Sequence, residues 1–151
     1  MKLAEALLIR ADLQKKTASL KERLVANAVV QEGDRPSEDT NALLGELTRI
    51  LDELEKLIAT INKANLEARI KTGLTLTDAL AKRDVLAQRH SILTAIVEAT
   101  SPQGRFRYGT SEIRWLPQLN AAELHKQADE VAKQLRELNA AIQEAGWNFN
   151  I

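Results

Sequence analysis

The sequence predicts an all-α fold, a four-helix bundle of long amphipathic helices with a small β-hairpin inserted between helices three and four. Apolar residues recur every three or four positions over long stretches, and few glycines or prolines interrupt them. Polar and apolar residues alternate instead at about 105–117, which supports the hairpin insert. We expect the 151 residues to form one domain, 1–151.

The first helix is expected over about 2–27, because leucines recur there at helical spacing and no glycine or proline occurs before Gly33. The polar stretch 31–40 then predicts a loop, since Gly33 and Pro36 both break helices. Three residues of this stretch could cap the next helix, namely Ser37, Asp39 and Thr40.

The second helix, expected to continue to about Arg69, carries two apolar rows. One row runs in steps of three and four from Leu43 to Ile61. The other repeats every seven residues as Leu44, Leu51, Ile58 and finally Asn65. Two rows form an apolar face that is wider than one antiparallel helix can cover. They therefore favour self-association of the chain.

The third helix has clear signals at both ends. Gly73 can end the preceding helix, and Thr75 and Asp78 have the spacing of a capping box. The third helix is then expected to end near Thr100, before a proline and a glycine.

In the next segment the spacing of the apolar residues changes from helical to alternating. Residues 105–108 and 112–116 alternate polar and apolar side chains around a possible turn at 109–111, which is typical of a β-hairpin. Pro117 closes this segment.

The fourth helix is expected over about 121–145, with a start signal at Asn120 and with Gly146 ending it. All aromatic residues lie at or after Phe106. We therefore expect three C-terminal residues spaced by two to pack on the hairpin, namely Trp147, Phe149 and Ile151.

Composition excludes several classes of protein. Lys plus Arg and Asp plus Glu are 21 each, so the formal net charge is zero, which makes nucleic acid an unfavoured partner and argues against an anionic membrane. The absence of cysteine excludes disulfides and cysteine-based zinc sites. Neither a signal peptide nor an uncharged apolar run of roughly 20 residues is present, so we expect a cytoplasmic protein without a membrane partner.

Polar residues interrupt the apolar rows of three predicted helices, namely Arg10, Asn62, Asn65, Arg83 and His90. A buried guanidinium without a carboxylate is costly, so we expect counter-charges from among Asp12, Asp84 and Asp129. The favoured interpretation is a structural layer that fixes helix register. The alternatives are a ligand-binding or active site between the helices, and long side chains that extend to solvent.

Metal and enzyme signatures are missing. A di-metal carboxylate bundle needs Glu-x-x-His on two helices, whereas His90 and His125 follow Ala87 and Ala122 at that spacing. We therefore expect no metal and no cofactor. Neither a nucleophile elbow nor a glycine-rich phosphate loop occurs, so the sequence favours a protein that is not an enzyme.

Three arginines alternate with aromatic residues in the predicted hairpin, namely Arg105, Arg107 and Arg114. Cationic and stacking side chains together could bind an anionic ligand or single-stranded nucleic acid. The favoured interpretation is ordinary strand alternation, in which the arginines face water.

Several short motifs occur in a fixed order along the chain: Ala-Leu-x-x-Arg-Ala-Asp-Leu at 6–13, Gln-Glu-Gly at 31–33, Ile-Asn-x-x-Asn at 61–65, Arg-Asp at 83–84, Ser-Glu-Ile at 111–113, Arg-Glu-Leu at 136–138, and Ile-Gln at 142–143 with Trp147. Together they resemble, over essentially the whole chain, a family of small bacterial helical proteins labelled septicolysin. The resemblance implies no established activity and no catalytic residues. We predict a non-enzymatic protein that forms homo-oligomers through coiled-coil contacts of its long helices.

Overall fold

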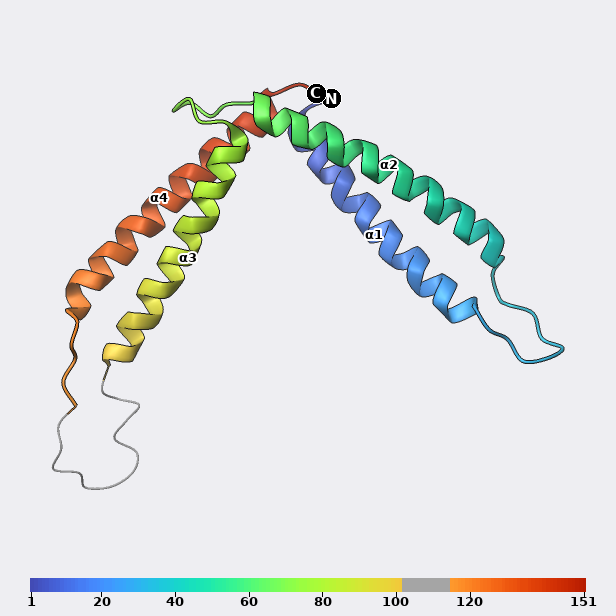
Figure 1. The fold of residues 1–151 in the computed structure, drawn as a ribbon, viewed down its shortest axis with the longest axis horizontal. Coiled ribbons are helices and arrows are strands. Elements are labelled where there is room, and N and C mark those ends of the chain that lie inside the picture. The colour runs from blue at the N-terminus through green and yellow to red at the C-terminus, as the bar shows by residue number, and fades with distance from the viewer. Residues whose placement is uncertain (102–114) are drawn as a thin grey trace. The chain divides into compact units, whose positions relative to one another are not determined.

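The computed structural model describes residues 1–101 and 115–151, which form four α-helices (Figure 1). Their bounds are α1 Leu3–Asn27, α2 Thr40–Glu67, α3 Leu76–Thr100 and α4 Ala121–Asn148. The predicted all-α class is confirmed, and no strand occurs in these two ranges. The predicted hairpin at 105–117 lies almost wholly outside the described residues. Residues 115–117, which are described, have no regular secondary structure.

The chain divides into two compact units. The first contains Met1–Arg69 and Gln143–Ile151, and therefore holds α1, α2 and the end of α4. The second contains Ile70–Ile142, and holds α3 with the rest of α4. The single-domain organisation stays a prediction.

Local capping explains where α2 and α3 begin. Asp39 is the N-cap of α2, and its carboxylate accepts hydrogen bonds from the Asn41 and Ala42 N–H groups at 3.0 and 3.1 Å. Thr75 is the N-cap of α3, where its Oγ1 accepts from the Asp78 N–H at 3.1 Å and donates to the Asp78 carboxylate at 2.7 Å. The predicted capping pair Thr75–Asp78 is therefore confirmed.

The other two helices begin in a similar way. At α1 the Lys2 N–H donates to the Glu5 carboxylate at 2.6 Å. At α4 the Asn120 side-chain oxygen accepts from the Glu123 N–H at 3.2 Å, which confirms the predicted start.

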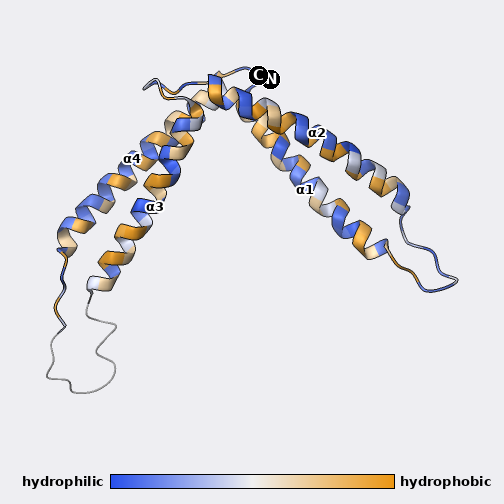
Figure 2. Ribbon diagram, in the orientation of Figure 1, coloured by the Kyte–Doolittle hydropathy of each residue, from blue (hydrophilic) through white to orange (hydrophobic). Residues whose placement is uncertain are grey.

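The core of the first unit lies between α1 and α2. It contains two buried residues from each helix, namely Leu13, Leu20, Leu43 and Ile50, with partly buried leucines packed around them. Figure 2 shows apolar and polar residues on different sides of these helices. Each fully buried leucine or isoleucine contributes about 1.5–3 kcal/mol to stability, so this stripe is what joins α1 to α2.

The second unit has its own buried residues. They are Ile70, which precedes α3, and six residues of α3 and α4, namely Leu76, Ala79, Leu86, Ala128, Val131 and Leu138. Residues of both helices line one cleft, so α3 and α4 lie side by side (Figure 1).

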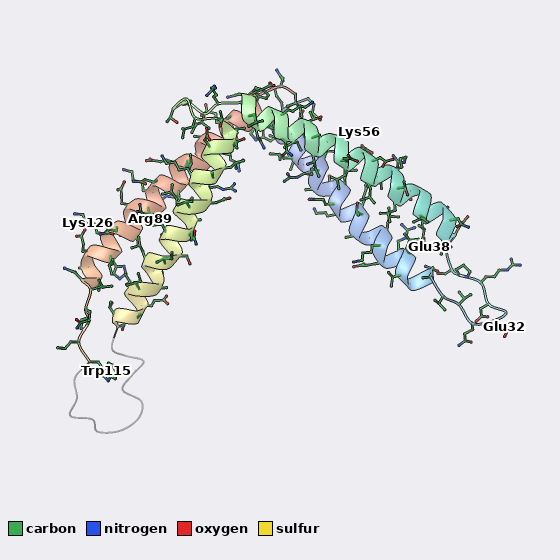
Figure 3. All side chains as sticks on the ribbon, in the orientation of Figure 1. Glu32, Glu38, Lys56, Arg89, Trp115 and Lys126 are labelled. Atoms are coloured by element: carbon green, nitrogen blue, oxygen red, sulfur yellow. The ribbon has the colours of Figure 1, made fainter. Side chains whose placement is uncertain are left out.

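The loop between α1 and α2 is fixed at its base. The Asn27 side-chain oxygen accepts from the Ser37 N–H at 2.9 Å and the Ser37 hydroxyl at 2.7 Å, while its amide donates to the Arg23 carbonyl at 2.9 Å. Arg23 also forms an ion pair with Glu38. Figure 3 shows Glu38 at the end of this loop, just before α2. Asn27 therefore interrupts the apolar row because it ties down this loop.

The end of α4 differs from the prediction. Gly146 does not end the helix, which continues to Asn148. Gly146 is buried, and a Cβ built on it would lie 3.8 Å from the Ala4 Cβ, so the residue is small where α4 meets α1.

The C-terminal segment pairs with the start of α1. The Phe149 carbonyl accepts from the Leu3 N–H at 3.0 Å, and the Ile151 N–H donates to the Met1 carbonyl at 2.9 Å. We expected this segment to pack on the hairpin, but its backbone partners are the first residues of the chain.

The two helical hairpins are repeats of each other. Helices α1 and α3 each contain 25 residues, and α2 and α4 each contain 28. Aligning α1 with α3 pairs identical residues: Leu3 with Leu76, Ala6 with Ala79, Leu7 with Leu80, Arg10 with Arg83, Leu13 with Leu86 and Leu20 with Leu93. Aligning α2 with α4 does the same: Leu43 with Leu124, Leu54 with Leu135, Leu57 with Leu138, Ile61 with Ile142 and Ala64 with Ala145. An internal repeat of one helical hairpin accounts for these matches.

Hydrogen bonds at the ends of the repeats are also equivalent. The Ile70 N–H donates to the Leu74 carbonyl at 2.9 Å, as the Ile151 N–H does to the Met1 carbonyl. The alignment pairs Ile70 with Ile151 and Leu74 with Met1. A turn at 71–73 links one pair, whereas the two ends of the chain form the other (Figure 1).

Candidate functional site

The six predicted ligand-binding residues are divided between the two units. Arg10, Asn62 and Asn65 belong to the first unit. Arg83, Asp84 and His90 belong to the second. Each group is therefore described separately, and a layer shared by all helices stays a prediction.

Arg10 lies in α1 between the buried residues Ala6 and Leu13. Its side chain is half-buried, and its Nε atom is buried without a hydrogen-bond partner. We expected a carboxylate beside it, but none of the ion pairs found among residues 1–101 and 115–151 involves Arg10. Among the described residues, the Arg10 Nε is thus the one buried side-chain nitrogen or oxygen without a hydrogen-bond partner.

The two predicted asparagines lie near the end of α2. Asn65 is half-buried and follows the buried Ala64, whereas Asn62 is exposed one turn earlier. Asn65 is therefore the asparagine that can contribute to a site inside the first unit.

Arg83 is the equivalent of Arg10 in the second unit and has a partner. Its Nε and Nη2 donate to the Asp84 Oδ1 at 3.0 and 2.7 Å. His90 lies two turns further along α3, is half-buried, and its backbone carbonyl accepts from the Thr94 hydroxyl at 2.9 Å. Asp84 is thus the expected counter-charge for Arg83.

The second apolar row of α2 forms an exposed strip on the first unit. The neighbouring residues Ile50 and Leu51 are 2% and 44% exposed, and Leu44 is 54% exposed. Ile58, the next member of the row, is half-buried. Together these side chains form an exposed apolar strip along one face of α2, whereas single exposed leucines are ordinary on a protein surface.

One end of this strip borders a cleft near the loop between α1 and α2. Leu44 lines this cleft together with Leu24, Val25 and Ala28, and its volume is about 360 Å³. The strip itself runs along α2 from Leu44 to Ile58.

A second cleft, of about 210 Å³, lies between α3 and α4 beside the turn that precedes α3. Its floor is apolar and buried, with Ile70, Leu86 and Leu138. Lys82 and Glu137 lie on its wall. It contains none of the predicted site residues.

Two kinds of feature are absent from residues 1–101 and 115–151. Within these ranges no group of three or more histidines or acidic residues is placed to hold a metal ion. No helix there has the length and apolar character needed to cross a membrane. Arg105, Arg107 and Arg114 lie outside the described residues, so anion binding by them stays a prediction.

Comparisons with known proteins agree with the fold. Residues 10–151 match a family described as a family of unknown function, DUF6847. The chain is also similar to the crystal structure of a functionally unknown conserved protein from Corynebacterium diphtheriae, with 34% identity and a TM-score of 0.89 over 98% of this chain and 96% of that one. No curated protein matches the chain. Neither similarity names an activity.

The internal repeat is the feature that sequence-based prediction missed. Its signal is the pattern Leu-x-acidic-Ala-Leu-x-x-Arg-x-x-Leu, which begins at Leu3 and again at Leu76. Once aligned, the repeats show that Ala11 stands where Asp84 follows the arginine. The aligned sequence therefore already shows that Arg10 lacks the carboxylate that follows Arg83.

Proposed function

Since this chain belongs to a family of unknown function, DUF6847, we propose that it is a non-enzymatic helical protein that self-associates through the exposed strip of α2. One observation carries the proposal, the strip formed by Leu44, Leu51 and Ile58. An isolated pair of helices can cover only the stripe between them, so a second apolar row on α2 needs another partner. A cytoplasmic location belongs to the same proposal, because a chain without cysteine needs no oxidising compartment.

A second copy of the chain fits this strip electrostatically. The net formal charge is zero, so two copies do not repel each other. A twofold axis near Leu51 would place Leu44 of one copy against Ile58 of the other, because each lies seven residues from Leu51 on α2.

Sedimentation velocity tests this proposal directly. At tens of micromolar we expect the native chain to sediment as a dimer or larger species, and Leu51→Glu to sediment as a monomer with unchanged helicity, because a buried glutamate opposes association. Leu66→Glu is the matched control, since Leu66 is also an exposed leucine of α2 but lies outside the strip.

Three results would contradict the proposal. A monomeric native chain at this concentration would remove self-association altogether. Equal loss of association in both variants would show that the strip is not the contact. If Leu51→Glu lowers the melting temperature without changing the mass, another part of the same chain covers the strip.

A second candidate function is ligand binding by the predicted polar residues. The buried Nε of Arg10, which has no hydrogen-bond partner, is the observation that favours it. The septicolysin label and the β-hairpin insert stay predictions, and neither is needed for these two candidates.

A further inference from the structure

We infer that Arg10 binds a small oxyanion, a carboxylate or a phosphate, and that Asn65 supplies an amide donor beside it. The inference rests on the ligand-binding candidate and names the chemical class of its ligand. It does not depend on self-association. Its basis is a difference between two arginines that occupy equivalent places in the repeat.

Arg83 shows what this position in the repeat requires. It lies on α3 between buried Ala79 and Leu86, so its guanidinium is only partly in water. Nε and Nη2 both donate to one carboxylate oxygen of Asp84, at 3.0 and 2.7 Å. The second repeat therefore satisfies its arginine with a charge-assisted pair of hydrogen bonds.

Arg10 has the same place but no such partner. It lies between buried Ala6 and Leu13, and the residue after it is Ala11. Its Nε is buried and makes no hydrogen bond. A buried donor without a partner is unfavourable, so an anion that accepts from this guanidinium stabilises the folded chain.

Asn65 and Arg10 lie at the same end of the α1–α2 pair. The antiparallel pairing of the two helices brings the end of α2, which carries Asn65, to the start of α1, which carries Arg10 (Figure 1). The Asn65 side chain is half-buried and takes part in none of the side-chain hydrogen bonds of the described residues. A guanidinium and a carboxamide together offer N–H donors and one positive charge.

These donors select an oxyanion. Guanidinium binds carboxylate and phosphate through two oxygens, and the carboxamide N–H₂ can donate to the same anion. Asp84 shows that the equivalent guanidinium in α3 binds a carboxylate. Because Arg10 is only half-buried, a small anion can reach its guanidinium from solvent.

The repeat supplies its own pair of test variants. Ala11→Asp gives Arg10 the carboxylate that Arg83 has, and Asp84→Ala removes the carboxylate from Arg83. The readout is the Nε–Hε NMR resonance of each arginine during separate titrations with inorganic phosphate and acetate, at constant ionic strength.

In the native chain we expect a saturable shift of the Arg10 resonance and no such shift at Arg83. Ala11→Asp should abolish the Arg10 shift, and Asp84→Ala should make the Arg83 resonance respond. The anion that acts at lower concentration distinguishes a phosphate ligand from a carboxylate ligand.

Two outcomes would overturn the inference. One is the absence of a saturable Arg10 shift with both anions, and the other is an equal shift at exposed arginines such as Arg49 and Arg89. If circular dichroism shows that Ala11→Asp disturbs the fold, the response of Arg83 in Asp84→Ala decides the question. Sedimentation of the same samples measures self-association separately, so one proposal can fail without the other.

Discussion

Arg23 and Glu38 are the residues whose charges affect each other most clearly. The Arg23 Nε donates to both oxygens of Glu38, at 3.1 and 3.0 Å, and this hydrogen bonding lowers the pKa of the Glu38 carboxyl and raises that of Arg23. Because the pair joins the end of α1 to the start of α2, protonation of Glu38 loosens the base of the loop.

The sign of the pH effect follows from the lowered pKa. The unfolded Glu38 takes up its proton near 4.5, before the folded one does. The contribution of the pair to stability is therefore complete above that pH and is lost as the pH falls through the lower folded pKa. An NMR titration should place the Glu38 midpoint below 4.5 in the native chain.

Substitution of Arg23 tests the cause of this shift. In Arg23→Gln we expect the Glu38 midpoint to return toward 4.5, because the hydrogen-bonded guanidinium is gone. Arg35→Gln removes an arginine from the loop that precedes Glu38 and should leave the Glu38 midpoint unchanged. An equal shift in both variants would mean that general charge, not the pair, lowers this pKa.

The sequence predicted which polar residues interrupt the apolar rows, but it did not predict what each of them contacts. The heptad rows pick out Arg10, Arg83 and Asn65, and all three are half-buried. They cannot show which arginine has a carboxylate, because that depends on the neighbouring residue and on the rotamer. Asn27 also interrupts an apolar row, yet it serves the adjacent loop.

Helix α2 depends on its N-cap residue more than the neighbouring helices depend on theirs. The loop before it is long and polar, so Asp39 alone satisfies the first free N–H groups through its carboxylate. Asp39→Ala should lower the free energy of unfolding by about 1 kcal/mol, measured by urea denaturation. Asp34→Ala, which removes the same charge from the same loop, should change it much less. Equal losses would attribute the effect to charge rather than to capping.

The bounds of a helix were predicted best where the apolar periodicity and the capping residues indicated the same ends. Helix α3 was expected to end near Thr100, and it runs from Leu76 to Thr100. The predicted end of the fourth helix at Gly146 was wrong, because glycine ends a helix in the left-handed conformation, and Gly146 does not adopt it. The alternating pattern at 105–117 stays untested. The pairing of the C-terminal segment with Met1 was also missed, since partners so distant in sequence leave no local pattern.

The whole molecule consists of two copies of one helical hairpin. Equivalent backbone hydrogen bonds close the turn at 71–73 and join Ile151 to Met1. The chain ends therefore meet where the repeat would place another short turn.

A circular permutant tests this equivalence. Linking Ile151 to Met1 through Lys-Thr-Gly, the sequence at 71–73, and opening the chain at Gly73 should give a protein with the native helical content. Because the new turn copies one already present, we expect a melting temperature within about 5 °C of the native value, measured by circular dichroism. Opening the chain inside α2, after Leu54, is the control and should unfold it. Equal behaviour of the two permutants would contradict the equivalence.

The contact between Met1 and Ile151 also affects biosynthesis. Helix α1 is translated before α4, but the backbone partners of Met1 and Leu3 lie at 149–151. At about 5–20 residues per second, α1 waits about seven to thirty seconds for them. Until then these hydrogen bonds cannot form, so a nascent chain that stalls before residue 149 exposes the unpaired start of α1 to proteases.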